Sequence, residues 1–387
     1  MSLLYATHAR IHLGNVRDNL LAIRAAVGPG RKVLAAVKAN GYGHGAVAVS
    51  RMAEETGAAD WLGVATVPEG IELREAGVTL PVLKLGPTFP EEMPAAVEAG
   101  ITLAVSSREE AEAVAQAALE RSRPASVHLK VDTGMGRVGV APGVAAAVAL
   151  RISALPGLSL DGVFTHLPVS DAADPGYTRE QVACFRALAE DVQEAAGKRL
   201  LVHCANSGAI LGHEPAWLDM VRPGIMIYGF RPDPETPDTI PLKPAMSLLT
   251  RVSFVKKVPA GTSIGYGRTW AAPRDTFIAT IPAGYADGFN RLFSNRGRVL
   301  VGGRSYPVVG RVCMDQSMVD LGPETDVTVG DEVVLMGTSG HAEIRCEEWA
   351  AKLGTITYEV TCQVSPRVTR VYDPYGPPPG NAPSRGD

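Results

Sequence analysis

Between residues 30 and 225 the chain alternates short apolar segments with longer amphipathic ones. The short segments are continuous Val- and Leu-rich runs, which is typical of parallel strands buried on both faces. The longer segments carry apolar residues at helical spacing, as in 45–57, 107–122 and 178–197. The strands expected from this pattern are VLAAVK (33–38), WLGVAT (61–66), PVLKL (81–85), ITLAV (101–105), VHLKVD (127–132), GVFTH (162–166), LLVHCA (200–205) and MVRPG (220–224).

Eight strands separated by helices within about 200 residues predict a (β/α)8 barrel of the TIM type. An open, doubly wound sheet is the alternative, but it would normally show fewer strands and a phosphate-binding glycine turn after the first. Ser107 followed by Glu110, and Thr178 followed by Gln181, each resemble a capping box and predict that helices begin there.

The pattern changes after residues 231–245, a segment rich in Pro, Asp and Thr that is typical of a linker. Closely spaced strand candidates follow, beginning with LLTRVSFVKKV (248–258), and EEWAAKLG (347–354) is the one expected helix, so a mostly β domain is predicted. We expect the barrel to span 10–235 and the β domain to span 236–372. We also expect the N-terminal residues 1–13 to pack with the β domain as part of it. Residues 373–387 are expected to form a disordered Pro/Gly tail.

Length, charge and cysteine usage narrow the class of protein. A chain of 387 residues favours two or three domains or one large barrel with an addition. The net charge of −4 supplies no basic excess for nucleic acid, and no apolar run approaches the roughly 20 residues of a membrane helix. The five cysteines are odd in number and widely spaced, which argues against a disulfide framework and against a metal site. With no secretory signal, these features favour a cytoplasmic enzyme.

The strongest candidate for chemistry is Lys38 in AAVKANGYGHG (35–45). A lysine at the carboxyl end of a barrel strand lies where active sites of this fold are built, and burial there suits Schiff-base chemistry. The alternative is a solvated ion pair at the rim. The segment is not a Walker motif, because the lysine precedes the glycines, and GYGHGA lacks the third glycine of a dinucleotide fingerprint.

Polar residues also end several other predicted strands. Any one of them could be structural, and a lone histidine at a strand end is usually a satisfied core group. Six or more polar strand ends converging on one barrel mouth are better explained by an active site. These residues are Lys130, Arg137, His166, His203, Asn206, Ser207 and Arg222.

Five motifs taken together resemble the PLP-dependent alanine racemases, an isomerase family. They are AVKANGYGHG, KVDTGMGRVG, RPGIMIYG, GYGRTW and CMD, in the order in which the family has them. The resemblance covers nearly the whole chain, from about residue 5 to residue 372. It implies interconversion of L-alanine and D-alanine, pyridoxal 5'-phosphate as cofactor, a homodimer, and supply of D-alanine for cell-wall peptidoglycan.

The resemblance also implies a pair of bases. Lys38 would hold the cofactor covalently and act as one base at the substrate α-carbon. Tyr266 would be the other base and would reach the opposite face of the cofactor from the partner subunit. A tyrosine with an ordinary pKa near 10 is a poor base at neutral pH, and His166 matches the residue that assists it in the family.

Further roles follow from the resemblance for the cationic residues. Arg222 would face the pyridine nitrogen of the cofactor, and because an arginine only donates it would keep that nitrogen unprotonated. Arg137 would bind the cofactor phenolate and help hold the substrate carboxylate. Lys130 matches a lysine that is carbamylated in many relatives.

The remaining implied contacts concern the phosphate, the substrate and the entrance. The phosphate would be held by hydroxyls and by backbone N–H groups of late barrel loops. The backbone N–H of Met314 would bind the substrate carboxylate, and Tyr285 and Asp315 would line the entrance. The cofactor-binding set implied in addition to Lys38, Arg137, His166 and Arg222 is Tyr42, Asn206, Ser207, Gly224, Ile225 and Tyr358.

Four other functions are compatible with parts of the sequence. A serine or broad-spectrum racemase would share the scaffold, since one added hydroxyl is hard to exclude by packing alone. Basic amino-acid decarboxylases have a similar two-domain plan, but CMD and GYGRTW argue against them. A non-catalytic PLP-binding barrel would have no use for the β domain with Tyr266. A nucleotide-dependent oxidoreductase is suggested only by GYGHGA.

Overall fold

The computed structural model describes residues 4–376, which divide into two compact units. One unit comprises residues 14–244 together with 375–376, and the other comprises residues 4–13 together with 245–374. The first unit therefore extends past residue 235, where the sequence analysis placed the boundary. Of the expected C-terminal tail, residue 373 ends a strand, and residues 377–387 lie outside the described part of the chain.

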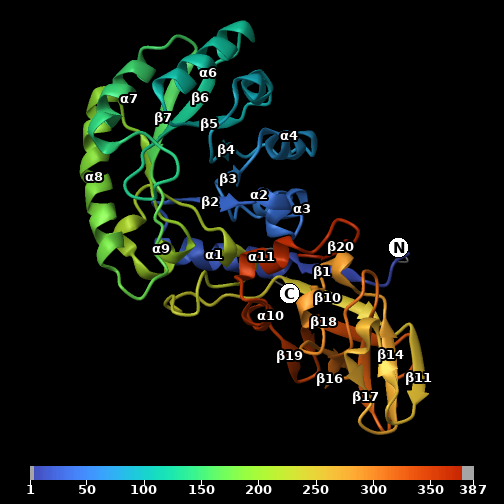
Figure 1. Cartoon of the computed structure of the whole chain (residues 1–387). Helices are drawn as coiled ribbons and strands as arrows, with labels where there is room; N and C mark the ends of the chain where they lie inside the picture. Colours follow the sequence, from blue (N-terminus) through green and yellow to red (C-terminus); the bar gives the residue numbers. More distant parts are fainter. Residues whose placement is uncertain (1–3, 377–387) are drawn as a thin grey trace, which may run out of the picture. The chain divides into compact units, whose positions relative to one another are not determined.

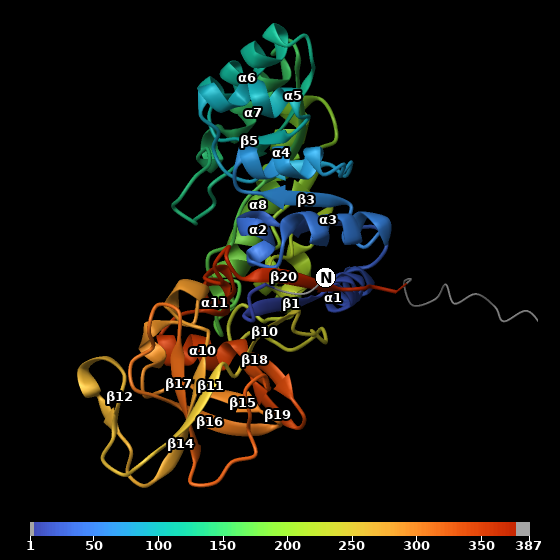
Figure 2. The same ribbon diagram turned by 90° about the vertical axis from the view of Figure 1, so that its right-hand side faces the viewer.

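The larger unit is built on eight parallel strands (Figures 1 and 2). They follow one another in the order β8-β7-β6-β5-β4-β3-β2-β9. Each overlaps one of the eight predicted segments, although β2, β6 and β7 begin one, two and four residues before the predicted starts. Backbone hydrogen bonds from Asp219 to Val202 (3.1 Å) and from Arg222 to Ala205 (2.9 Å) bring β9 beside β8. The sheet thus nearly closes, and the predicted (β/α)8 barrel is confirmed. The strands are β2 (Lys32–Ala36), β3 (Trp61–Val64), β4 (Val82–Lys84), β5 (Thr102–Val105), β6 (Ala125–Lys130), β7 (Leu158–Phe164), β8 (Leu201–His203) and β9 (Met220–Val221).

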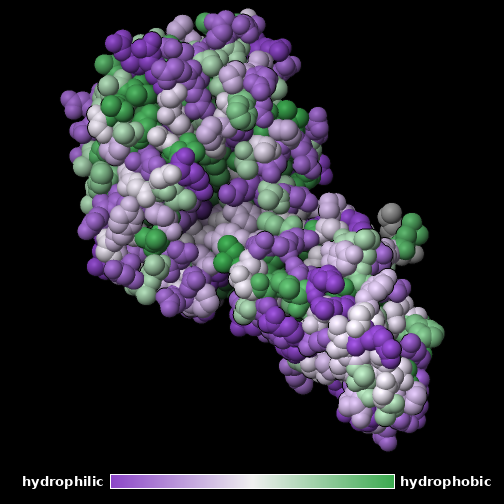
Figure 3. Space-filling model, in the orientation of Figure 1, coloured by the Kyte–Doolittle hydropathy of each residue, from purple (hydrophilic) through white to green (hydrophobic). Residues whose placement is uncertain are grey.

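Helices cover the outside of these strands (Figures 1 and 2). Their outer faces carry mostly hydrophilic side chains (Figure 3), while Leu34, Leu83 and Met220 pack together in the barrel core. Burying each such side chain contributes about 1.5–3 kcal/mol. The helices are α1 (Leu13–Val27), α2 (Lys38–Tyr42), α3 (Ala46–Glu55), α4 (Val67–Glu75), α5 (Met93–Glu98), α6 (Arg108–Glu120), α7 (Ala145–Ser153), α8 (Gly176–Ala196) and α9 (Ser207–Gly212).

The two expected capping boxes have different outcomes. The Ser107 hydroxyl accepts from the backbone N–H of Glu110 (3.0 Å), so α6 begins as predicted, although the Glu110 carboxylate binds the N–H of Ser106 instead. The start predicted at Thr178 is wrong, because α8 begins earlier, at Gly176. Thr178 and Gln181 are buried inside the helix, where Gln181 contacts another segment rather than a cap.

The smaller unit is mostly β-sheet, as predicted. Its main sheet has the order β11-β14-β17-β16-β15-β18-β10-β1-β20, with β19 paired to β18. Strand β1 lies between antiparallel β10 and parallel β20, so the sheet joins segments from near the two ends of the described residues. The strands are β1 (His8–His12), β10 (Met246–Arg251), β11 (Phe254–Val258), β12 (Ser263–Ile264), β13 (Trp270–Ala271), β14 (Thr276–Ile281), β15 (Arg298–Val301), β16 (Arg304–Val309), β17 (Ser317–Gly322), β18 (Glu332–Ser339), β19 (Ala342–Ile344) and β20 (Thr369–Asp373).

Two local predictions in this unit are wrong. The segment 248–258 is not one strand, because it divides into β10 and β11, which pair with different neighbours. The predicted helix 347–354 corresponds to α10 (Cys346–Leu353), but a second helix, α11 (Thr357–Cys362), follows it. The sequence of α11, TYEVTC, is rich in β-branched and aromatic residues of low helix propensity, so the sequence pattern did not indicate a helix there. None of the helices between residues 4 and 376 has the length and apolarity needed to cross a membrane.

Candidate active site

Lys38 lies two residues after Ala36, the last residue of β2, and opens a left-handed backbone turn. The φ angles of Ala39, Asn40, Gly41 and Tyr42 are 52°, 52°, 61° and 51°. This conformation costs roughly 1–2 kcal/mol for each residue other than glycine. Hydrogen bonds from two side chains offset part of that cost. The Asn40 amide oxygen accepts from the backbone N–H of Ala46 (2.9 Å), and the Glu69 carboxylate accepts from the backbone N–H of Ala39. Backbone strain of this kind clusters at functional sites.

Four cationic side chains gather at the carboxyl ends of the barrel strands. Lys38 follows β2, Lys130 ends β6, Arg137 lies in the loop after β6, and Arg222 follows β9. Lys130 and Arg222 are only 5% and 6% exposed. Burial, assisted by the charges of Arg222, Arg137 and Lys38, lowers the pKa of Lys130 to about 7, although Asp132 opposes the shift. So much positive charge in a poorly solvated place suits a ligand with several negative charges.

Arg222 is held in one orientation from several directions. It donates to His203 Nδ1 (2.9 Å) and to the carbonyls of Thr165 (2.8 Å) and Cys204 (3.2 Å), with His166 Nδ1 at 3.4 Å. Burial lowers its pKa to about 10, so Arg222 remains charged at neutral pH. Because a guanidinium can only donate, the facing Nδ1 atoms of both histidines act as acceptors and their protons lie on Nε2.

The histidine chain continues into the barrel through a residue that the sequence analysis did not single out. His203 Nε2 lies 3.0 Å from Nδ1 of His128, which is fully buried on β6. Burial lowers the pKa of His128 to about 4 and holds the pKa of His203 well below its ordinary value. Both rings are therefore neutral, and the positive charge stays on Arg222. His128 precedes Lys130 by two residues, so period-two spacing along the strand could have indicated that both face the barrel interior.

The loop that carries Arg137 is organised by Asp132, another residue that the sequence analysis passed over. The Asp132 carboxylate accepts from the backbone N–H groups of Gly134 (2.9 Å), Gly136 (3.1 Å) and Arg137 (3.1 Å). These bonds hold the pKa of Asp132 below its ordinary value against the opposing effect of burial. Gln181 of α8 also donates to the carbonyl of Thr133 (3.2 Å). The backbone of Arg137 is thereby fixed, while its side chain is exposed.

Hydroxyl and backbone donors meet in a small cradle at Gly224. The Gly224 N–H donates to Ser207 Oγ (2.9 Å), and a Cβ added at Gly224 would lie 2.6 Å from Tyr42 Oη. Ile225 begins a 3-10 turn, so its N–H has no carbonyl a turn earlier to bind. Asn206 caps α9 by accepting from Ala209 (3.1 Å) and so places Ser207. This donor set, next to four cations, fits the phosphate group of PLP.

The predicted residues of the β unit collect around a pocket of about 690 Å³. Tyr266, flanked by left-handed Gly265 and Gly267 between β12 and β13, is 74% exposed. Tyr358 is not in the lining and lies on α11. The lining residues are Tyr266, Tyr285, Arg291, Arg311, Val312, Cys313, Met314, Asp315 and Gln316. The fold thus brings together Tyr266, Tyr285, Met314 and Asp315, which come from three separate loops.

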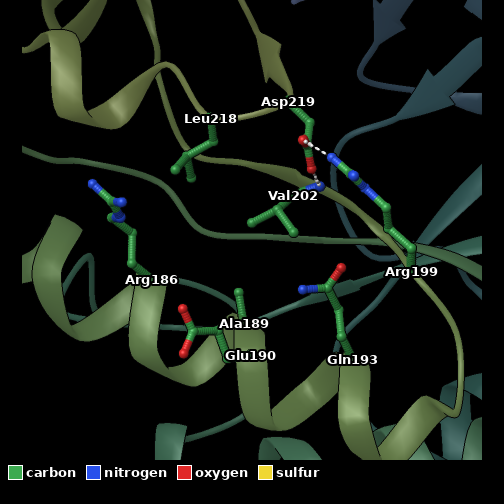
Figure 4. Close-up of a pocket in the computed structure, with 8 residues that line it drawn as sticks. All are labelled: Arg186, Ala189, Glu190, Gln193, Arg199, Val202, Leu218 and Asp219. Carbon is green, nitrogen blue, oxygen red and sulfur yellow. Dashed lines mark hydrogen bonds and ion pairs between the residues drawn. The ribbon is translucent and has the colours of Figure 1, made fainter.

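Another cavity, of about 510 Å³, lies on the barrel unit near α8 (Figure 4). Asp219 there accepts from Arg199 (3.0 Å) and from the backbone N–H of Val202 (3.0 Å). Its other charged residues, Arg186 and Glu190, are exposed, and none of the predicted site residues lines it. In residues 4–376 no group of three or more His, Cys, Asp or Glu side chains is arranged to hold a metal ion.

Comparison with known families identifies the chain. Its residues 11–232 match the family model described as the alanine racemase N-terminal domain, and residues 245–372 match the model of the C-terminal domain. The chain belongs to the alanine racemase family. It is 49% identical over 367 residues to the alanine racemase of Cutibacterium acnes, with 95% of this chain and 97% of the relative covered. The family's reaction, interconversion of L-alanine and D-alanine, is the activity of this chain.

Solved structures of the family agree with both units. The alanine racemase of Clostridium difficile 630 superimposes with a TM-score of 0.91 at 38% identity, covering 96% of this chain and 97% of that one. The alanine racemase from Bartonella henselae, described as having covalently bound pyridoxal phosphate, gives a TM-score of 0.84 at 25% identity over 95% of this chain and 99% of that one. The family resemblance predicted from the motifs is therefore confirmed.

Proposed function

We propose that this racemisation proceeds by two-base proton transfer with pyridoxal 5'-phosphate as the cofactor. The observation that carries this proposal is Lys38 at the mouth of the barrel, among cations and beside the cradle at Gly224. The cofactor, when bound, takes up the electron pair that remains after the α-proton of the amino acid leaves. The other groups in the reaction would be side chains and backbone N–H groups of this chain.

Most of the residues that would hold the cofactor belong to the barrel unit. Lys38 would bind it covalently, Arg137 would bind the phenolate oxygen, and Arg222 would face the ring nitrogen. The phosphate would be held by Tyr42, Ser207, Tyr358 and the N–H groups of Gly224 and Ile225, with Asn206 placing Ser207. The Bartonella henselae relative, described as having covalently bound pyridoxal phosphate, supports a covalently held cofactor of this kind.

Arg222 would keep the pyridine nitrogen of the cofactor unprotonated, which limits how far the ring can delocalise an electron pair. A carboxylate at that position would keep the ring nitrogen protonated, whereas Arg222 is held as a charged donor by His203 and two carbonyls. The nitrogen would therefore accept a hydrogen bond and stay unprotonated. The electron pair would be less delocalised into the ring, which leaves fewer side reactions such as transamination.

Proton transfer needs one base on each face of the substrate. We assign Lys38 to one face and Tyr266 of the partner subunit to the other, which makes a homodimer the functional unit. His166 is partly buried, and burial and Arg222 hold its pKa well below the ordinary value. A neutral His166 that carries its proton on Nε2 donates a hydrogen bond, which stabilises the tyrosine oxygen as it loses its proton.

Substrate capture uses the carboxylate of alanine. Arg137 and the backbone N–H of Met314 would bind it, and Tyr285 and Asp315 would line the entrance. The exposure of Met314 (53%) and Tyr285 (42%) at the rim of one pocket supports this assignment. We further propose that the enzyme works in the cytoplasm and supplies D-alanine for peptidoglycan.

The wild-type protein tests the proposal directly. We expect purified protein to be yellow and to exchange the α-hydrogen of both L-alanine and D-alanine with deuterated solvent. The same exchange assay with serine and with lysine distinguishes an alanine racemase from a broad-spectrum racemase, because the two classes of enzyme differ in the size of side chain that they accept. Absence of exchange from either alanine enantiomer would contradict the two-base assignment.

Lys130 is proposed to carry a carbamate. Because burial and the neighbouring cations lower the pKa of this lysine to about 7, the neutral amine is populated at neutral pH, and it adds to CO₂ and releases a proton. The resulting anion would sit among Arg222, Arg137 and Lys38 and hold Arg137. We expect peptide mass analysis after chemical trapping at pH 8 to show added CO₂ on Lys130, and less of it below pH 7, where the amine is protonated.

Lys84 is the internal control for this modification. It is equally buried (3% exposed), but its ammonium donates to the carbonyls of Gly86 and Pro87 and faces the carboxylates of Glu92 and Glu110. We expect Lys84 to remain unmodified. Equal labelling of both lysines, or none on Lys130 with bicarbonate present, would overturn the proposal.

A further inference from the structure

We propose that Arg367 is a positioning residue for substrate capture, which it serves by tying the turn that carries Met314 to a buried carboxylate. The inference rests on the proposed function, in which the Met314 N–H binds the substrate carboxylate. Arg367 lies between α11 and β20 and is not part of the pocket lining. It therefore acts through other residues.

Two turns form one side of the pocket, and they are joined through the backbone. The N–H of Tyr285 donates to the carbonyl of Cys313 (3.0 Å), and the N–H of Ala286 donates to that of Met314 (3.0 Å). A Cβ added at Gly284 would lie 2.3 Å from the Met314 carbonyl oxygen, so no side chain fits there. The position of Met314 therefore depends on the turn at 284–287.

Asp287 anchors the 284–287 turn. Its carboxylate is fully buried and accepts from the N–H of Gly284 (2.8 Å) and from the hydroxyl of Tyr5 (3.1 Å). Arg367 donates to both of its oxygens, from Nε at 2.7 Å and from Nη2 at 3.0 Å. A buried carboxylate needs such a partner, because burying it alone would cost several kcal/mol.

The third nitrogen of the same guanidinium reaches the second turn. Arg367 Nη1 donates to Asp315 Oδ1 at 2.8 Å, and Asp315 is the residue directly after Met314. A guanidinium is planar and rigid, so its two edges set the spacing between Asp287 and Asp315. A lysine ammonium, as a single point donor, cannot keep both contacts in this geometry.

The Asp315 contact is the part of this bridge that can be removed without unfolding the unit. The Asp315 side chain is 61% exposed, whereas that of Asp287 is fully buried. Asp315→Ala therefore frees the Met314 turn and leaves the buried pair of Arg367 and Asp287 intact. Arg367→Ala would strip the buried carboxylate of its partner and is less informative.

We test the inference with Asp315→Ala, Asp315→Asn and Arg367→Lys in the full-length holoenzyme. Asp315→Ala should raise KM for both alanine enantiomers about 10-fold and change kcat less than about 2-fold, because a ground-state contact is loosened. Asp315→Asn keeps an oxygen that accepts from Arg367, so its KM should stay within about 3-fold of wild type. Arg304→Lys, in an exposed pair with Asp326 of the same unit, is the matched control and should leave KM unchanged.

A double variant decides whether Arg367 acts through Asp315. The KM of Asp315→Ala combined with Arg367→Lys should match that of the stronger single variant, since both remove the same contact. Additive effects, or unchanged KM in both single variants with only a lower melting temperature, would overturn the inference and leave Arg367 a structural residue. The proposed function fails separately, if the wild type does not racemise alanine.

Discussion

Replacement of Lys38 by alanine is expected to remove both the visible chromophore and racemisation. Lys38 stands at the carboxyl end of β2 and would supply both the covalent link to the cofactor and one of the two bases. Loss of a covalent catalyst that is also a base should lower kcat by at least about 10⁴-fold. The absorption spectrum and the rate of racemisation of purified protein measure the two effects.

Lys32→Ala is the matched control, because Lys32 lies on the same strand at its opposite, exposed end. This variant should keep the colour and the rate of the wild type. A Lys38→Ala protein that remains yellow after dialysis and still racemises alanine would show that another residue holds the cofactor.

The Tyr266→Phe variant should affect proton exchange from L-alanine and from D-alanine differently. The variant lacks the phenolic oxygen that would exchange a proton on the L-alanine side, while Lys38 can still serve the D-alanine side. We expect α-deuterium exchange from L-alanine to fall by about 10³-fold and exchange from D-alanine to be retained, so that net racemisation fails in both directions. Exchange from each enantiomer is followed separately by mass spectrometry.

Tyr306→Phe controls for the loss of a tyrosine hydroxyl in the same unit. Tyr306 lies on β16, away from the pocket that contains Tyr266. This variant should exchange both enantiomers at the wild-type rate. Unchanged turnover in Tyr266→Phe, or equal loss of exchange from both enantiomers, would refute the assignment of Tyr266 as the base on one face.

The regular parts of the fold could be predicted because their signals are local. The barrel strands are mainly apolar, although β6 and β7 also carry polar residues, and this local pattern was enough to find all eight. Helix α11 was missed because its residues have low intrinsic helix propensity. The start at Thr178 was wrong because a residue pattern typical of a cap lies inside a helix that begins at Gly176.

The sequence predicted several residues of the candidate site, but not the residues that position them. Lys38, Lys130 and Arg222 attract attention as charged residues next to apolar strands, and the motifs around them resemble one family. His128, Asp132 and Arg367 escaped notice because each acts on another side chain or on the backbone. Nothing in their local sequence marks a buried histidine relay, a loop anchor or a bridging guanidinium.

The sequence by itself determined the barrel, the β domain and the family, because strand patterns and motif order are properties of neighbouring residues. The tertiary structure alone decided the electrostatic state of the site. The pKa of Lys130, the proton position on His203 and the bridge from Arg367 to Asp287 depend on distances between residues far apart in the chain, 80 positions in the last case. Charge interactions and hydrogen bonds act through space over a few ångströms, so they exist only once the chain has folded.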